Sequence, residues 1–437
     1  MDLVRRNLGL VFLLLLVSGR VFAQANVVPP PKTEAQMRDM MKITYNQHIL
    51  PEGANPLMLE HLMEIGEVVI YYDRPQGVKW MSAAGIMINA PVDQVFAVVG
   101  DFTHYKDYVP FSQAAEVQKV ANNFERVDFH LRVAMFFLHY SVDYGVYHLH
   151  RPPYRTDWCY AWGDFGLNVG FWELIPTADG KRTMAFYSVY SEPRSSLIKA
   201  IYDRDPQLEL MTNVSTAVMV TRAVKGEAEK RSASAGQKAL AMPRTKKIFE
   251  VLNEDPDTMK KFLDRGNLLV LEDGPTVYVT AGALVNATRE QSWNTVTDFP
   301  SYTQFAPGTK KVEYLGKGDK GPKYRVEVST NLLVLEYSYQ YEPEYVLTPP
   351  ELLTYVNSSQ TGNPTRGFTK LVEFGSKTLL FSGSTADIRA MSRVLNYALT
   401  KEPTLEHAIE GSQALVNTNS LKKEIEKRAA GKTPDKK

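Results

Sequence analysis

The spacing of apolar residues changes several times along this chain, and the same succession of spacings occurs twice. In its first occurrence, residues 79–88 form an apolar run typical of a buried strand, and the apolar residues of 95–99 then follow at helical spacing. VDFHLRV from Val127 and LHYSVDYGV from Leu138 alternate between apolar and polar residues, which predicts strands with one buried face. Further strands are predicted at residues 157–162, 170–175 and 183–190.

Each succession closes with a long amphipathic helix, which begins near Pro206 in the first and Pro403 in the second. A proline in the first turn of a helix loses no hydrogen bond. One apolar stripe follows in each helix: Leu210, Val214, Ala217 and Thr221, then Leu405, Ile409, Ser412 and Val416. The order of strand, short helices, antiparallel strands and long helix predicts an α+β fold with helices on one face of a curved sheet.

The two successions also match residue by residue. INAPVDQVFAVVGDFTHYKDYVPFSQAAEV from Ile88 aligns without a gap with VNATREQSWNTVTDFPSYTQFAPGTKKVEY from Val285, at an offset of 197 residues. A repeat this long indicates that each copy is a complete domain. We therefore divide the chain as follows: N-terminal extension 24–61, first domain 62–231, linker and helical lead-in 232–261, second domain 262–428, and disordered tail 429–437, with residues 24–32 also expected to be disordered.

The clearest repeated motif reads DFTHYKDYVP from Asp101 and DFPSYTQFAP from Asp298. We expect the two aspartates to accept backbone hydrogen bonds at the break between two short helices. The aromatic residues are spaced three apart and would share one face of a helical turn: Phe102, Tyr105 and Tyr108, with Phe299, Tyr302 and Phe305. Because the motif copies share no nucleophile or metal-ligand set, we interpret the motif as architecture rather than chemistry.

Composition narrows the classes of partner and cofactor. With 50 basic and 49 acidic side chains the formal net charge is +1, which gives no electrostatic footprint for a nucleic-acid backbone. Cys159 is the single cysteine, so an intramolecular disulfide and a cysteine-based metal site are excluded. The sequence contains no Gly-rich phosphate loop, no His-Glu-x-x-His and no Gly-x-Ser-x-Gly. We expect no nucleic-acid partner, no metal and no cofactor.

The N-terminal residues have the pattern of an export signal. Arg5 and Arg6 precede the apolar run 8–17, and Val21-Phe22-Ala23 resembles a small-residue cleavage site. The run is shorter than the roughly 20 apolar residues that span a bilayer. We predict a signal peptide at 1–23, cleavage near Ala23, and a periplasmic or secreted protein; an uncleaved anchor is the alternative.

INAPVDQVFAVVGDFTHYKDYVP, its second copy and the long C-terminal helix of each copy resemble the START-like (SRPBCC) superfamily, particularly its polyketide cyclase/dehydrase and coenzyme Q-binding branches. The resemblance covers both copies. It implies two tandem helix-grip domains, each a curved antiparallel sheet wrapped around a long C-terminal helix, with an apolar cavity between sheet and helix. Members of that superfamily bind lipids, sterols, quinones or polyketides, and only some of them are enzymes.

Candidate site residues are mostly aromatic. Trp158, Tyr160 and Trp162 alternate along one strand and would share a face, with Phe171 and Phe186 on neighbouring strands. Large rigid rings suit a flat apolar ligand, although an ordinary bulky core explains them equally well. The expected ligand-binding residues are Phe102, Tyr105, Tyr108, Trp158, Tyr160, Trp162, Phe171, Phe186, Phe299, Tyr302 and Phe305.

Ionisable residues concentrate on two strands of the first copy. His130 and His139 are weak candidates for an acid or base, because His130 is in phase with Asp128 and Arg132 and the simpler interpretation is a solvated sheet face. His148 and His150 share a face, but no third metal ligand is evident.

Three functions remain open at this point. The leading hypothesis is an exported protein that carries or sequesters a lipid, isoprenoid, quinone or polyketide-like molecule, with transient contacts to a membrane or to envelope proteins. The second is a polyketide or polyene cyclase or dehydratase that works in the first domain. Whether the protein is an enzyme is therefore uncertain, and a binding role without catalysis is favoured. The third is a non-binding scaffold of an envelope complex.

Overall fold

The computed structural model describes residues 28–73, 80–135, 138–194, 199, 206–235, 247–274, 276–332, 335–357, 365–391, 393–401 and 403–431. The signal peptide predicted at 1–23 and residues 432–437 of the predicted tail lie outside the described residues. We refer to residues 28–235 as the first half and to residues 247–431 as the second half.

The first half begins with two helices and ends with the long helix α7. Its elements are α2 (Glu34–Met40), α3 (Pro56–Ile65), β1 (Glu67–Asp73), β2 (Trp80–Ile88), α4 (Val92–Val99), η1 (Phe102–His104), α5 (Tyr105–Tyr108), β3 (Ser112–Ala121), β4 (Phe124–Met135), β5 (Leu138–Arg151), β6 (Arg155–Gly163), β7 (Phe165–Pro176), β8 (Thr183–Pro193) and α7 (Pro206–Ser234).

The second half repeats this order from its own pair of leading helices to α13. Its elements are α8 (Ile248–Glu254), α9 (Pro256–Leu263), β9 (Gly266–Glu272), β10 (Tyr278–Val285), α10 (Arg289–Val296), η2 (Phe299–Ser301), α11 (Tyr302–Phe305), β11 (Thr309–Lys317), β12 (Pro322–Leu332), β13 (Leu335–Tyr341), β14 (Pro343–Thr348), β15 (Leu352–Asn357), β16 (Arg366–Phe374), β17 (Lys377–Thr385), η3 (Ile388–Met391), α12 (Arg393–Lys401) and α13 (Thr404–Ala429).

The strands of both halves join into one continuous antiparallel sheet. Its order runs β3-β4-β5-β6-β7-β8-β2-β1-β9-β10-β17-β16-β15-β14, and β12 continues it with β11 and β13 on its sides. The halves meet where β1 pairs with β9, with Val69 opposite Leu269. Aligned from Asn55-Pro56 and Asp255-Pro256, the leading segments of the halves correspond at an offset of 200. Val69 and Leu269 are therefore equivalent residues, and the ladder around them is pseudo-symmetric.

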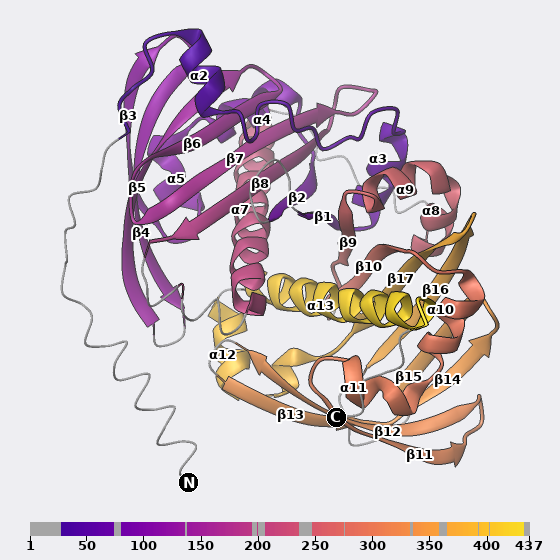
Figure 1. Cartoon of the computed structure of the whole chain (residues 1–437). Coiled ribbons are helices and arrows are strands. Elements are labelled where there is room, and N and C mark those ends of the chain that lie inside the picture. Colours follow the sequence, from indigo (N-terminus) through magenta and orange to yellow (C-terminus); the bar gives the residue numbers. More distant parts are fainter. Residues whose placement is uncertain are drawn as a thin grey trace.

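The long helices pack on one face of this sheet. α7 packs against β2 and β8, α13 packs against β10 and β17, and the two helices also contact each other between the two curved parts of the sheet (Figure 1). The predicted stripes are largely confirmed, since Val214, Ala217 and Thr221 of α7 and Leu405 and Ile409 of α13 are buried. The expected α+β fold of two tandem helix-grip units is confirmed.

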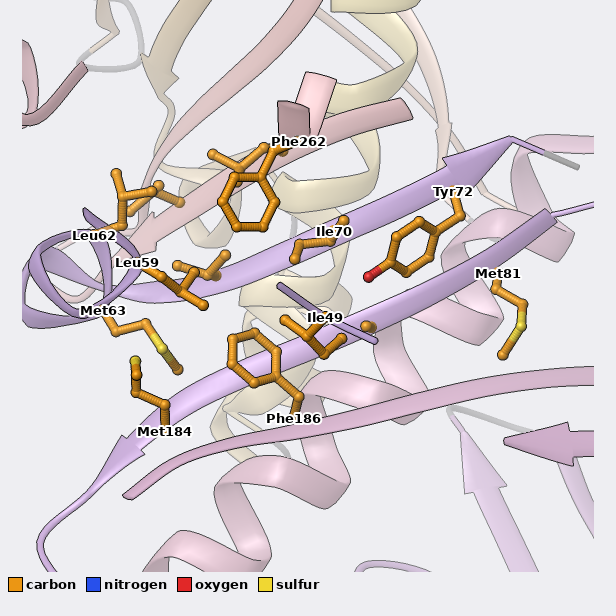
Figure 2. Packing of buried hydrophobic residues seen from close by; sticks show 14 of the residues in the cluster. Ile49, Leu59, Leu62, Met63, Ile70, Tyr72, Met81, Met184, Phe186 and Phe262 are labelled. Atoms are coloured by element: carbon orange, nitrogen blue, oxygen red, sulfur yellow. The ribbon is translucent and has the colours of Figure 1, made fainter. Parts of the chain in front are cut away.

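The opposite face of the central strands carries a second core, which we name the outer cluster. Leading helices supply Leu59, Leu62 and Met63 from α3 and Phe262 from α9, and these residues pack with Ile49, Ile70, Tyr72, Met81, Met184 and Phe186 (Figure 2). Full burial of a large apolar side chain stabilises a fold by about 1.5 to 3 kcal/mol. The leading helices are thus part of the folded unit and cover the sheet at the junction of the halves.

The repeated aspartate pairs with an arginine near the C-terminal end of the long helix and does not cap a short helix. Asp101 accepts from Arg231 of α7 at 2.8 Å, and Asp298 accepts from Arg428 of α13 at 2.8 Å. The expectation that these carboxylates accept backbone hydrogen bonds is wrong, because neither aspartate side chain makes a helix-capping hydrogen bond. A charged guanidinium from the neighbouring helix gives a stronger, charge-assisted bond than a backbone amide.

The segment before the first helix is partly ordered. Residues 24–32 were expected to be disordered, but Val28 donates its backbone amide to Ala161 O at 2.8 Å and accepts from Tyr147 Oη at 2.9 Å. That expectation is wrong for Val28, whose backbone is hydrogen-bonded to β5 and β6.

None of the helices in the described ranges is both long and apolar enough to cross a membrane.

Candidate functional site

A group of aromatic rings fills the space between α4, α5, α7 and the inner face of the first half's sheet. We call it the first interior; its members are Phe102, Tyr105, Phe129, Tyr144, His148, Trp158, Trp172 and Tyr187. The ring of His148 lies 4.5 Å from that of Phe102 and 5.9 Å from that of Trp158, centroid to centroid. The imidazole is therefore enclosed by aromatic carbon.

His148 is the one strongly desolvated base of this group. Its side chain is 4% exposed, and its Nδ1 atom makes no hydrogen bond to any described residue. Burial, and secondarily the neighbouring His150, lower the pKa of His148 well below its ordinary value. His150 is satisfied, with Thr156 at 2.9 Å and Glu125 at 3.0 Å. The first interior thus holds one neutral imidazole whose nitrogen can accept or donate a single hydrogen bond.

Trp158 reaches this position because of two residues on β7. Its indole Nε1 donates to Asn168 Oδ1 at 2.9 Å. A Cβ at Gly170 would lie 2.1 Å from the Trp158 ring, so only glycine leaves room for the ring at that point of the strand. Gly367 plays the same part under Tyr355 in the second half, where a Cβ would lie 2.6 Å from the phenol oxygen.

The second half has a corresponding second interior, in which phenols predominate. Its members are Phe299, Tyr302, Tyr324, Tyr339, Tyr341, Tyr345 and Tyr355. The rings of Phe299 and Tyr345 lie 4.1 Å apart, and those of Tyr345 and Tyr355 lie 5.5 Å apart. Tyr341 and Tyr355 keep some accessible surface, yet burial raises the pKa of Tyr341 to about 12 and that of Tyr355 well above its ordinary value.

Several tyrosines of both interiors have a raised pKa because of burial, although their side chains keep some accessible surface. They are Tyr302, Tyr341 and Tyr355 in the second interior, and Tyr144 and Tyr187 in the first. Both interiors therefore offer ring surface that the described residues do not cover completely.

The expected aromatic residues divide between the two faces of the sheet. Phe102, Tyr105, Tyr108 and Trp158 belong to or pack on the core of the first interior, and Phe299, Tyr302 and Phe305 belong to or pack on that of the second. Phe171 and Phe186 lie in the outer cluster, on the opposite face, so the expectation that they neighbour Trp158 in one site is wrong. Gly85, opposite Phe186 on β2, leaves room for the Phe186 ring on that face, because a Cβ at Gly85 would collide with it.

Trp162 does not share the face of Trp158. Opposite β5 the register shifts, since Gly145 pairs with Trp162 while the next residue, Val146, pairs with Tyr160. This bulge reverses the alternation that the sequence predicted. Trp162 consequently packs on the outer cluster and donates to Asp128 Oδ1 at 2.5 Å, whereas Tyr160 donates to Gly163 O at 3.3 Å.

Of the two weak acid–base candidates, His130 lies outside the first interior. His130 is 46% exposed and pairs with Asp143, which confirms the solvated face as its environment. His139 lies in β5, where its backbone pairs with Ala134, and its side chain is outside the described set. His148 is the ionisable residue that sequence reasoning undervalued; its phase with Val146 and Tyr144 on β5 was the available signal. Within the described ranges no group of three metal-ligating side chains occurs.

Comparison with known proteins agrees with this geometry in the first half. Residues 88–232 match the family model described as "Polyketide cyclase / dehydrase and lipid transport". Within the first half, residues 88–232 are therefore similar to this family. No match was found among curated protein sequences.

Solved structures with some similarity include both one-domain and two-domain proteins. The Zhui aromatase/cyclase from Streptomyces sp. R1128 is 18% identical, covering 36% of this chain and 98% of its own, with a TM-score of 0.29. The di-domain aromatase/cyclase StfQ of the steffimycin pathway is 12% identical, covering 80% and 99%, with a TM-score of 0.27. A STAR-related lipid transfer protein from Xanthomonas axonopodis is 16% identical, covering 37% and 93%, with a TM-score of 0.29.

Proposed function

We propose that the chain binds a flat, mostly apolar small molecule, such as a lipid, isoprenoid, quinone or polyketide-like compound, in the space between sheet and long helix. The enclosure of a neutral, unpartnered His148 among Phe102 and Trp158 is the observation that carries this proposal. An apolar pocket with few polar groups is the usual form of a small-molecule site, because the rings supply contact area and the polar atoms set orientation. The family match of residues 88–232 supports the same reading.

We further propose that the second half is a second START-like domain, with domain limits at 62–231 and 262–428. Support comes from the shared element order and from the paired contacts of Asp101 with Arg231 and Asp298 with Arg428. Each half would then present its own interior to a ligand.

We also propose that the protein is exported and carries its ligand across an aqueous space, meeting a membrane or envelope protein transiently. The charged and apolar pattern of residues 5–23 supports export. A hydrophobic molecule needs such a carrier because its transfer from apolar surroundings into water is unfavourable.

The test is mass spectrometry of the protein purified from its host without detergent, in the native state and after solvent extraction. We expect a stoichiometric apolar compound that is lost on extraction. A protein that is empty and also fails to bind apolar fluorescent probes would contradict ligand binding and would favour the scaffold role.

A second candidate function is a cyclase or dehydratase acting in the first half. The observation in its favour is that His148 is a neutral base facing aromatic surface, which is the state that proton abstraction beside a carbonyl requires. The variants His148→Phe and His130→Ala separate the two roles. Loss of turnover with retained binding in His148→Phe alone would support the enzyme, and unchanged ligand composition in both variants would leave the carrier.

A further inference from the structure

Helix α13 buries a carboxyl group that no contact in the described structure explains. The side chain of Glu410 is 8% exposed, and its Oε1 atom is buried without a hydrogen-bond partner. Glu406, one turn earlier, is also buried but pairs with Arg389 at 2.7 Å. Isolated buried carboxyl groups are rare because desolvation penalises them, so Glu410 calls for a partner from outside the chain.

The phenols of the second interior lie next to this carboxyl group. Burial, and then Tyr341 and Glu410, raise the pKa of Tyr339, which places Glu410 within electrostatic reach of that phenol. The rings of Tyr339 and Tyr341 are stacked 6.1 Å apart. Tyr341 in turn is close enough to Tyr302 and Tyr355 to raise the pKa of both phenols. Glu410 thus lies near the phenols of the second interior.

The first half offers no such group at the equivalent position. Asn213 occupies the place of Glu410 at the offset of 197, and its Nδ2 donates to Glu209 O at 2.9 Å within α7. The place of Tyr339 is taken by Val142. The repeat therefore satisfies the polar group in one half and leaves it unsatisfied in the other.

The protonation state of Glu410 limits what it can bind. Burial, with a smaller contribution from Glu406, raises the pKa of Glu410 to about 8, so the group is a neutral carboxylic acid at neutral pH. A neutral acid offers no charge to a cation, but its O–H is a strong hydrogen-bond donor. The complementary ligand atom is a neutral oxygen acceptor on a flat molecule that stacks on phenol rings.

Building on the proposed function, we propose that Glu410 donates a hydrogen bond to a carbonyl oxygen of the ligand in the second half, and that this ligand is a quinone or an aryl ketone. The donor lies on the long helix and the rings lie on the sheet. A ligand held by both would bridge α13 to β13, β14 and β15. The first half, which lacks the acid, would accept flat apolar molecules with or without a carbonyl group.

The experiment compares two probes of equal shape on the full chain by isothermal titration calorimetry. Menadione carries two quinone oxygens, and 2-methylnaphthalene carries none. The variants are Glu410→Leu, which removes the donor, Glu410→Gln, which keeps a neutral donor of similar size, and Asn213→Leu, the matched control at the equivalent position of α7. Circular dichroism checks that each variant is folded, and Glu410→Met replaces Glu410→Leu if the latter does not fold.

We expect the wild-type chain to bind menadione at a site that is weakened about three- to tenfold in Glu410→Leu, the range of one hydrogen bond. Glu410→Gln and Asn213→Leu should stay close to wild type, and 2-methylnaphthalene should not distinguish the variants. Equal menadione affinity in Glu410→Leu and wild type, with 2-methylnaphthalene still bound, would overturn this inference and leave the proposed function standing. Failure of both probes to bind the wild-type chain would overturn both.

Discussion

The two halves of the chain share a frame and differ inside it. Asp101 and Asp298 make the same ion pair with the long helix, and the phenol hydroxyls of Tyr105 and Tyr302 both bond to a helix carbonyl, at 2.6 and 2.8 Å. Residues that differ line the interiors, where Tyr345 stands in place of His148, Tyr355 in place of Trp158, and Glu410 in place of Asn213. Residues that are the same in both copies therefore hold the shared fold together, and residues that differ between the copies are the candidates for ligand binding or catalysis.

The outer face shows a second difference. In the first half, Arg155 and Asp157 form a buried ion pair, and Arg155 also bonds to Glu173 at 2.9 Å and to Thr44 O at 2.7 Å. The second half has Leu352, Thr354 and Lys370 at the three equivalent positions. The N-terminal extension thus contacts the first half through this charged network in addition to apolar packing, while α8 and α9 cover the second half through apolar packing.

The largest effect is expected from breaking that charge network. Asp157→Ala removes a fully buried carboxylate that pairs with both Arg151 and Arg155. Although Glu173 still contacts Arg155, loss of one partner of a buried pair costs about 3 to 5 kcal/mol. Thr354→Ala at the equivalent site is the control and should cost less than about 1 kcal/mol. Urea unfolding followed by tryptophan fluorescence measures both. Similar midpoints for the two variants would mean that the network does not hold the extension.

Next in size is the pH-dependent effect of Glu410. Because the pKa of Glu410 is raised to about 8, the unfolded chain loses this proton before the folded chain does, and stability falls as pH rises from about 4.5 to 8. Glu410→Gln removes this loss, so its stability relative to wild type should grow between pH 4.5 and pH 7 by about 3 kcal/mol. Urea midpoints at pH 4.5, 6 and 7 check the slope. A constant difference would show that Glu410 is ionised in the folded chain.

A smaller, equal effect is expected in both halves from the repeated ion pair. Asp101→Asn and Asp298→Asn each remove a partly exposed pair, which is worth about 0.5 to 1 kcal/mol. Burial alone would raise the pKa of Asp101, but the bonds from His104 and Arg231 lower it, so its contribution is present above pH 4 and is lost on acidification. Thermal unfolding of both variants at pH 7 tests the equality. A clearly larger loss in one half would mean that the pair serves a different role there.

The sequence predicted the frame well because the frame is periodic. The helix at 92–99, the meander and both long helices follow from apolar spacing, and the 197-residue repeat predicted one fold for both halves. The β1–β9 ladder was not predicted, since a buried apolar strand does not specify which strand it pairs with.

Site residues were harder to predict because a strand has only two faces and one extra residue exchanges them. The bulge at Ala161 turned Trp162 outward, and Phe171 and Phe186 proved to be on the outer face. Glu410 could not be identified in advance, because a glutamate on an amphipathic helix normally indicates a solvated position.

The smallest effect at pH 7 is expected from His148→Phe, and its pH dependence is opposite to that of Glu410→Gln. Burial lowers the pKa of His148 well below the ordinary value of 6.5 and keeps the side chain neutral. On acidification the unfolded chain therefore binds a proton at this residue and the folded chain does not. Wild-type stability should therefore fall below about pH 6.5, and His148→Phe should lessen that fall while changing stability at pH 7 by less than about 1 kcal/mol. His130→Ala is the control, since His130 is 46% exposed. Urea midpoints measured from pH 5 to 7 test this prediction. Parallel curves for wild type and His148→Phe would mean that His148 is solvated and that the first interior is open to water.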